Sequence, residues 1–161
     1  MLCRSYARLA GLTIALALTL VRPPAALALA AAKSSDLVTL ESSGTTDPAC
    51  PLGGTPFATR ILPDGTREPF TIPAKRVLVI TSVDYVFETP IPDGGPAFFR
   101  VSLQTTEIVP VLSDTTVANT GSAAGRAEAA AGVAVRAGPP LCADAGITRS
   151  ALLHGFLAKD K

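Results

Sequence analysis

His154 is the only histidine in this chain of 161 residues, so triad or acid–base chemistry that needs an imidazole would have to use it. A Ser–His–Asp triad would combine His154 with Asp84, Asp114 or Asp144 and a serine from elsewhere. No Gly-x-Ser-x-Gly segment, which marks the nucleophile turn of many hydrolases, accompanies it. Apolar residues two positions to either side favour a structural strand histidine. An exported hydrolase that uses His154 is therefore an alternative hypothesis, and no catalytic residue is assigned.

The cysteines predict a disulfide bond. Cys3 lies in residues 1–32, an N-terminal segment that we expect to be removed, which leaves Cys50 and Cys142. An even number of cysteines in an exported chain typically forms disulfides, and closing so long a loop would add about 4–5 kcal/mol in the chain-entropy model. Two buried free thiols are the alternative. Two cysteines and one histidine cannot complete a tetrahedral zinc site, so we expect no metal and no cofactor.

The carboxylates do not form an obvious catalytic pair. Asp84 and Glu88 would lie about 13 Å apart along one face of a strand, whereas a glycosidase pair needs about 5–9.5 Å. Asp64 and Asp93 precede glycines in turns, where an aspartate caps its own backbone. A calcium site at these turns is an alternative, although no Asp-x-Asp-x-Asp-Gly loop is present.

Four residues are candidates for a contact surface: Phe98, Arg100, Tyr85 and His154. Phe98 falls on the face opposite the apolar one, beside Arg100 and a Pro/Gly-rich loop, which suits an exposed anchor; a core position on a second face is the alternative. Tyr85 lies on an apolar strand face, where a core tyrosine is the alternative. The chain has no tryptophan, which disfavours sugar stacking. A small carbohydrate-binding module is nevertheless a further hypothesis, so a protein or a glycan could be the partner.

Residues 1–32 predict a signal peptide. Arg4 and Arg8 precede the 13-residue apolar run Leu9–Val21, which has the length of a signal-peptide apolar region and is too short to span a bilayer. Arg22-Pro23-Pro24 ends the expected signal helix, and small residues then predict cleavage between 28 and 32. We expect a secreted or periplasmic protein that contacts the membrane only through this segment; an uncleaved anchor over residues 9–32 is the alternative.

Composition excludes one class of partner. Apolar residues make up 48% of the chain, and 23 of the first 32 residues are apolar. Residues 1–32 also include three arginines, so 11 basic and 13 acidic residues remain after this segment. No basic stripe is present, and we therefore expect no nucleic-acid partner.

The remaining chain alternates between apolar and polar residues with a strand period. We predict a flexible N-terminal segment over 33–56, with one strand candidate at Leu37–Leu40, and a β-sandwich domain over 57–161. Arg76–Glu88 is the longest predicted strand, with its odd positions apolar throughout and a bend or bulge near Ser82. We also predict a strand over Phe70–Ile72.

The later segments complete an all-β pattern. Pro110 predicts an edge strand over 107–112, whereas 113–125 reads as a polar loop. Residues 127–137 are ambiguous between strand and helix, with the strand favoured, and 148–158 predicts the last strand. About eight strands with regular turn signals predict an antiparallel β-sandwich or jelly roll.

Two segments carry a resemblance to a known group of proteins. FTIPAKRVLVITSVDY (70–85) and LLHGFLA (152–158) are similar to a central and a closing strand of uncharacterised exported bacterial β-sandwich proteins. The chain departs from that pattern, because no glycine follows Pro73-Ala74 and Phe156 stands where tyrosine is common. The resemblance implies export and a sandwich fold, but no activity and no functional residue.

These observations lead to one leading hypothesis. We expect a secreted or periplasmic, non-catalytic β-sandwich protein that acts by binding or assembly. A homo-oligomer is one form of such an assembly, because an edge strand can pair with another chain.

Overall fold

The computed structural model describes residues 33–42, 45–50, 54–88, 94–104, 108–118, 122–144 and 148–160. The predicted signal helix therefore lies outside the described residues. Within the described ranges, no helix is long and apolar enough to cross a membrane.

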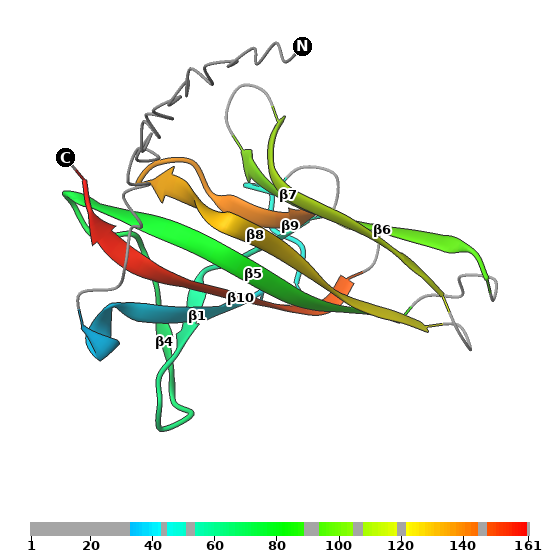
Figure 1. Cartoon of the computed structure of the whole chain (residues 1–161), viewed down its shortest axis with the longest axis horizontal. Coiled ribbons are helices and arrows are strands. Elements are labelled where there is room, and N and C mark those ends of the chain that lie inside the picture. Colours follow the sequence, from blue (N-terminus) through cyan, green and yellow to red (C-terminus); the bar gives the residue numbers. More distant parts are fainter. Residues whose placement is uncertain are drawn as a thin grey trace, which may run out of the picture.

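The described part of the chain is built almost entirely from antiparallel strands (Figure 1). One short 3-10 helix precedes them. In chain order the elements are η1 (Ser34–Asp36), β1 (Leu37–Glu41), β2 (Thr55–Pro56), β3 (Thr59–Ile61), β4 (Arg67–Pro69), β5 (Arg76–Glu88), β6 (Pro96–Gln104), β7 (Ile108–Val117), β8 (Ser122–Arg136), β9 (Leu141–Asp144) and β10 (Thr148–Lys159).

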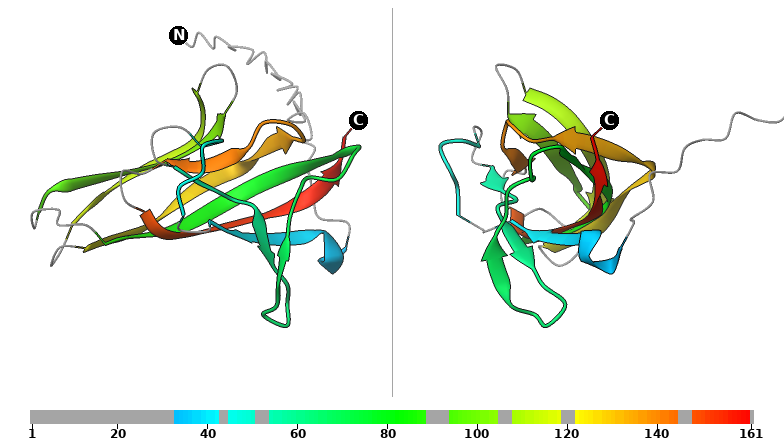
Figure 2. Two further views of the ribbon diagram at one scale, coloured as in Figure 1. Left: turned by 180° about the vertical axis from the view of Figure 1, so that it is seen from behind. Right: turned by 90° about the vertical axis from the view of Figure 1, so that its left-hand side faces the viewer.

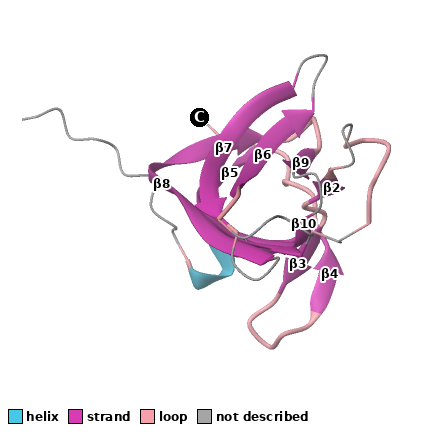
Figure 3. Ribbon diagram, turned by 90° about the vertical axis from the view of Figure 1, so that its right-hand side faces the viewer, coloured by secondary structure: helices cyan, strands magenta, loops and turns pink. Residues whose placement is uncertain are grey.

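These strands form two sheets. The six-stranded sheet has the order β4-β3-β1-β10-β5-β8, and the four-stranded sheet has the order β2-β9-β6-β7. Seen from one end, the sheets face each other around the core (Figure 2); from the opposite end, the β3–β4 hairpin projects away from the body (Figure 3). The prediction of an all-β antiparallel sandwich is confirmed.

The N-terminal strand belongs to the larger sheet. β1 pairs with β10 on one side and with β3 on the other, and its residues Val38 and Leu40 are buried. The predicted strand at Leu37–Leu40 is confirmed, and the sheet thus includes residues that precede Phe57.

Apolar side chains from both sheets fill the space between them. β5 contributes Leu78 and Ile80, β6 contributes Phe99 and Val101, and β10 contributes Leu153, all with almost no exposed surface. Burial of each such side chain stabilises the fold by about 1.5–3 kcal/mol. The apolar residues that alternate with polar ones along these strands are therefore the residues that point into the core.

The predicted irregularity near Ser82 is a bulge at Thr81. The pairing of β5 with β8 and with β10 shifts between Ile80 and Ser82, which leaves Thr81 without a partner in either ladder. Thr81 is the one extra residue relative to β10, whereas residues 129–132 of β8 are also unpaired opposite it. One extra residue moves every later side chain to the other face.

The bulge corrects the predicted face of this strand. Leu78 and Ile80 face the main core before the bulge, whereas Val83 and Tyr85 face it afterwards. The prediction that the odd positions stay on one apolar face was therefore wrong. Val77 and Val79 instead form a small second cluster with Ala158, against which Phe156 packs.

Three further predictions are settled by pairing. The edge strand with Pro110 is confirmed, since β7 ends the four-stranded sheet. The prediction of a loop over 113–125 was wrong, because β7 runs to Val117 and β8 begins at Ser122. The polar residues there indicate exposure, and threonine suits a half-exposed strand. Residues 127–136 are a strand, because pairing with β5 overrides the helix propensity of alanine.

The strand predicted over Phe70–Ile72 was wrong. β4 ends at Pro69, and the Phe70 N–H donates to the Ala58 carbonyl at 2.7 Å outside the strand ladder. Phe70 and Ile72 are partly buried against the core, so their apolar character reflects packing rather than strand pairing.

Gly155 permits the close approach of β10 to β5 beside the bulge. A Cβ at this position would lie 2.3 Å from the Val79 carbonyl oxygen, which belongs to the backbone of β5 and cannot rotate away. We expect Gly155→Ala to lower the free energy of unfolding by about 3 kcal/mol or more, as measured by urea denaturation.

Gly94→Ala is the matched control. Gly94 has a φ of 79°, but nothing lies within 4 Å of the position that its Cβ would take, so the alanine meets only backbone strain of about 1–2 kcal/mol. Equal losses of stability in the two variants would contradict the close-approach argument.

Candidate functional site

Cys50 and Cys142 are joined by a disulfide bond, as predicted. Their Cα atoms are 5.8 Å apart across a sequence separation of 92 residues, and both side chains are buried. The bond ties the segment that precedes β2 to strand β9. A disulfide fits an oxidising extracellular compartment, and it removes both thiols from nucleophilic chemistry.

Tyr85 lies in the core and not on a surface. Its side chain is 2% exposed, and its ring stacks on Phe99 with a centroid distance of 4.2 Å. The hydroxyl donates a hydrogen bond of 2.7 Å to Oδ2 of Asp114 on β7. The core interpretation of Tyr85 therefore holds, and its ring is not available for a contact surface.

Burial raises the pKa of the Tyr85 hydroxyl well above its usual range, and the hydrogen bond and negative charge of Asp114 raise it further. The cause is that an ionised phenolate would lose its hydration and would face a carboxylate. Tyr85 is thus held as a neutral donor.

His154 belongs to a polar row on the outer face of the six-stranded sheet. Its neighbour Leu153 points into the core, so His154 points outward. The row runs across four paired strands, through Thr39 on β1, His154 on β10, Ser82 on β5 and Glu128 on β8.

Asp84 orients the imidazole of His154. Its Oδ2 lies 3.0 Å from Nε2 of His154, and the Oγ1 of Thr39 lies 3.4 Å from Nδ1. Because a carboxylate only accepts hydrogen bonds, Nε2–H donates to Asp84. In the neutral imidazole Nδ1 is then an acceptor, toward which the Thr39 hydroxyl can donate.

Arg126 closes this network on the side of β8. Its guanidinium lies 3.6 Å from Asp84 Oδ1 and 3.1 Å from Glu128 Oε1, and it donates to the hydroxyl of Ser82 at 3.0 Å. The side chains of Asp84 and Arg126 are 41% and 54% exposed, so each pair contributes about 0–1 kcal/mol to stability. Thr39, His154 and Asp84 together resemble the hydroxyl, base and carboxylate of a triad, with a threonine in place of a serine.

Phe98 and Arg100 lie on the opposite side of the molecule. Phe99 and Val101 face the core from β6, so Phe98 and Arg100 point to the outer face of the four-stranded sheet. Phe98 is 68% exposed, and Val117 on β7 is 63% exposed on the same face. The structure therefore separates the four predicted contact residues into two outer faces and the core.

The other acids do not build a metal site among the described residues. Asp64 accepts hydrogen bonds from the N–H and the hydroxyl of Thr66, which lower the pKa of its carboxyl, so it caps its turn as expected. Within the described ranges, no group of three or more His, Cys, Asp or Glu side chains could hold a metal ion. The side chains of Glu88 and Asp144 lie outside the described part of the structure, and Asp93 lies wholly outside it.

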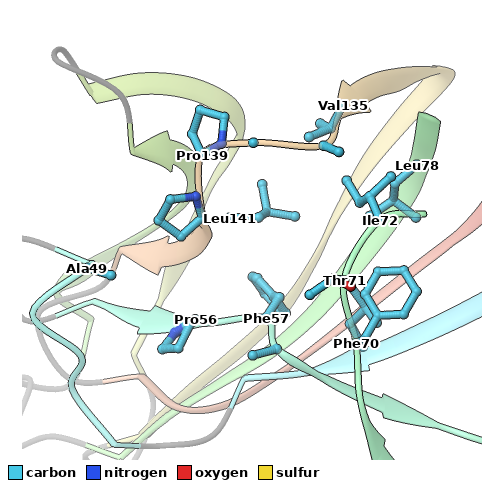
Figure 4. A pocket seen from close by; sticks show the side chains of 15 residues that line it. Ala49, Pro56, Phe57, Phe70, Thr71, Ile72, Leu78, Val135, Pro139 and Leu141 are labelled. Carbon is cyan, nitrogen blue, oxygen red and sulfur yellow. The ribbon is translucent and has the colours of Figure 1, made fainter. Parts of the chain in front are cut away.

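An apolar cavity of about 400 Å³ is a feature that the sequence did not reveal (Figure 4). It lies at one end of the sandwich and includes none of the predicted site residues. Segments far apart in the sequence contribute to it. The lining comprises Leu40, Ala49, Pro56, Phe57, Ala58, Phe70, Thr71, Ile72, Leu78, Val135, Ala137, Gly138, Pro139, Pro140 and Leu141.

No protein-family model, no curated protein and no solved structure matches this chain. Its function therefore has to follow from the chemistry of the surfaces and the cavity described above.

The neutral state of Tyr85 predicts a pH dependence of stability. In the unfolded chain the phenol ionises near pH 10, whereas the folded state keeps the proton because its pKa is raised. The stabilisation that the neutral Tyr85 hydroxyl gives the fold is complete below about pH 10. It is lost as the pH rises further toward the pKa of Tyr85 in the folded state. We expect the free energy of unfolding, measured by urea denaturation from about pH 8 to 11.5, to fall more steeply for the wild type than for Tyr85→Phe.

The Tyr85→Phe comparison isolates this group from lysines that titrate in the same range. Parallel pH profiles for the two proteins would show that Tyr85 ionises as easily in the folded state as in the unfolded state.

Proposed function

We propose that this is an exported, non-catalytic β-sandwich protein that acts by assembly, with the outer face of the four-stranded sheet around Phe98 as its contact surface. Export is supported by the N-terminal pattern of the sequence and by a disulfide suited to an oxidising compartment. The exposed Phe98 is the observation that carries the choice of surface.

Phe98 does not stand alone on this face. It pairs with Thr115, and Val117 pairs with Pro96, so Phe98 and Val117 are diagonal neighbours with Cβ atoms about 7–8 Å apart. Arg100 lies two residues along the strand on the same face. An aromatic ring, an aliphatic side chain and an arginine together are typical of the centre of a protein contact.

A second copy of the chain is the partner that we propose. β7 ends the four-stranded sheet, and beyond it Thr116 donates to the Ala124 carbonyl of β8. The outer face of the sheet is therefore the contact that we propose, because two copies related by a two-fold axis present the same patch to each other. The chain after residue 32 carries 11 basic and 13 acidic residues, so charge repulsion between copies is small.

Replacement of Phe98 tests this surface. We expect the wild type to self-associate in sedimentation velocity at micromolar concentration and Phe98→Asp to sediment as a monomer, because a carboxylate on the contact would be desolvated. Leu37→Asp is the control, since Leu37 is 56% exposed on β1 in the other sheet. A monomeric wild type, or equal behaviour of the two variants, would contradict the proposal; binding of the wild type on a glycan array would instead favour a carbohydrate-binding module.

A hydrolase is the second candidate, and the contacts of His154 with Thr39 and Asp84 are the observation that favours it. A carboxylate lies against one imidazole nitrogen and a hydroxyl against the other, as in a catalytic triad, but the nitrogens are exchanged, because Asp84 is on Nε2 and Thr39 is on Nδ1. The geometry is open to solvent, since the His154 side chain is 33% exposed.

Activity measurements separate the two candidates. Under the leading proposal we expect wild type and His154→Ala to show the same background rate on a panel of nitrophenyl esters and glycosides. A wild-type rate that falls at least about a hundredfold in both His154→Ala and Thr39→Val, with folding unchanged, would establish the hydrolase instead.

A further inference from the structure

We propose that the cavity at the end of the sandwich binds one small, uncharged, apolar molecule, such as a hydrocarbon chain or ring. This site is separate from the Phe98 surface, because none of the residues of that surface lines the cavity.

The floor of the cavity is part of the main core. Leu40 from β1, Leu78 from β5 and Val135 from β8 reach it with 1–2% exposure. Phe57 and Leu141 are also buried and lie on its inner wall. An occupant would therefore contact side chains that are already held rigidly by the two sheets.

The rim is exposed and opens the cavity to solvent. Ala49, Ala58, Thr71 and the segment 137–139 are exposed, and Phe70 and Ile72 are half-buried between rim and floor. Figure 4 shows Phe57, Ile72 and Leu141 around the same space, contributed by different segments of the chain. A ligand could thus enter without separation of the sheets.

The lining defines the chemistry of the ligand. It contains no charged side chain, and Thr71 alone supplies a side-chain hydroxyl. A buried charge without a partner is strongly disfavoured, so the site selects a neutral molecule. The volume of about 400 Å³ lies in the usual range of small-molecule sites.

The walls resist collapse into this space. Three prolines, Pro56, Pro139 and Pro140, restrict the backbone on one side. The Cys50–Cys142 bond holds Ala49 and Leu141, the neighbours of its two cysteines, in place. Because the rim admits solvent, an apolar occupant would remove water from these apolar side chains, which is favourable.

The test uses 1-octanol and octanoate as matched probes of nearly equal size. We expect saturation-transfer NMR on the purified, disulfide-bonded protein to detect 1-octanol, and octanoate at about pH 8 to bind at least about tenfold more weakly because its charge would be desolvated. Equal binding of the two probes, or no binding of 1-octanol, would overturn the proposal.

Substitutions at Thr71 place the ligand in this cavity. Thr71→Asp should weaken 1-octanol binding at least about tenfold, whereas the isosteric Thr71→Val should retain it. Ala134→Asp adds the same charge to an exposed position of β8 outside the lining and should leave binding unchanged. If Thr71→Asp binds 1-octanol as the wild type does, the ligand lies elsewhere and the assignment of the cavity fails.

Discussion

The structure depends on the bulge at Thr81, where β5 carries one residue more than its partner β10. In an uninterrupted strand, the face that holds Leu78 and Ile80 would also receive Ser82 and Asp84, and a carboxylate would point into the apolar core. The bulge reverses the alternation, so Val83 and Tyr85 enter the core and Asp84 faces outward. Gly155 on β10 accommodates the close backbone approach beside it.

This reversal also determines which chemistry each side of the molecule presents. Asp84 contacts His154 because both lie on the outer face of the larger sheet. Tyr85 points to the opposite face of β5, into the core, where its hydroxyl donates to Asp114. Phe98 lies on the far outer face, since Phe99 fills the core from the same strand. The apolar cavity stands apart from all three, at the end where β2, β9 and the segment after β4 converge. The chain thus keeps its polar network, its apolar anchor and its cavity on separate surfaces.

Much of the fold was predictable from local patterns, but the errors have a common cause. The limits of β5 and β10, the irregularity near Ser82 and the edge position of Pro110 follow from alternation and proline chemistry. The loop predicted over 113–125 and the strand predicted over Phe70–Ile72 were wrong for the same reason. Polar residues indicate exposure and apolar residues indicate burial, whereas strand pairing depends on the neighbouring chain. The cavity left no signal, because its lining is assembled from segments between Leu40 and Leu141.

By itself the sequence determined the period-two folding pattern and predicted a disulfide between its last two cysteines. Each of these follows from residue type and local spacing, which persist in any fold. Tertiary structure alone decided that His154 meets Asp84 and Thr39, that Tyr85 is buried on Phe99, and that Phe98 is exposed. Those contacts join strands distant in sequence, and their register is fixed only when the two sheets bury a common core.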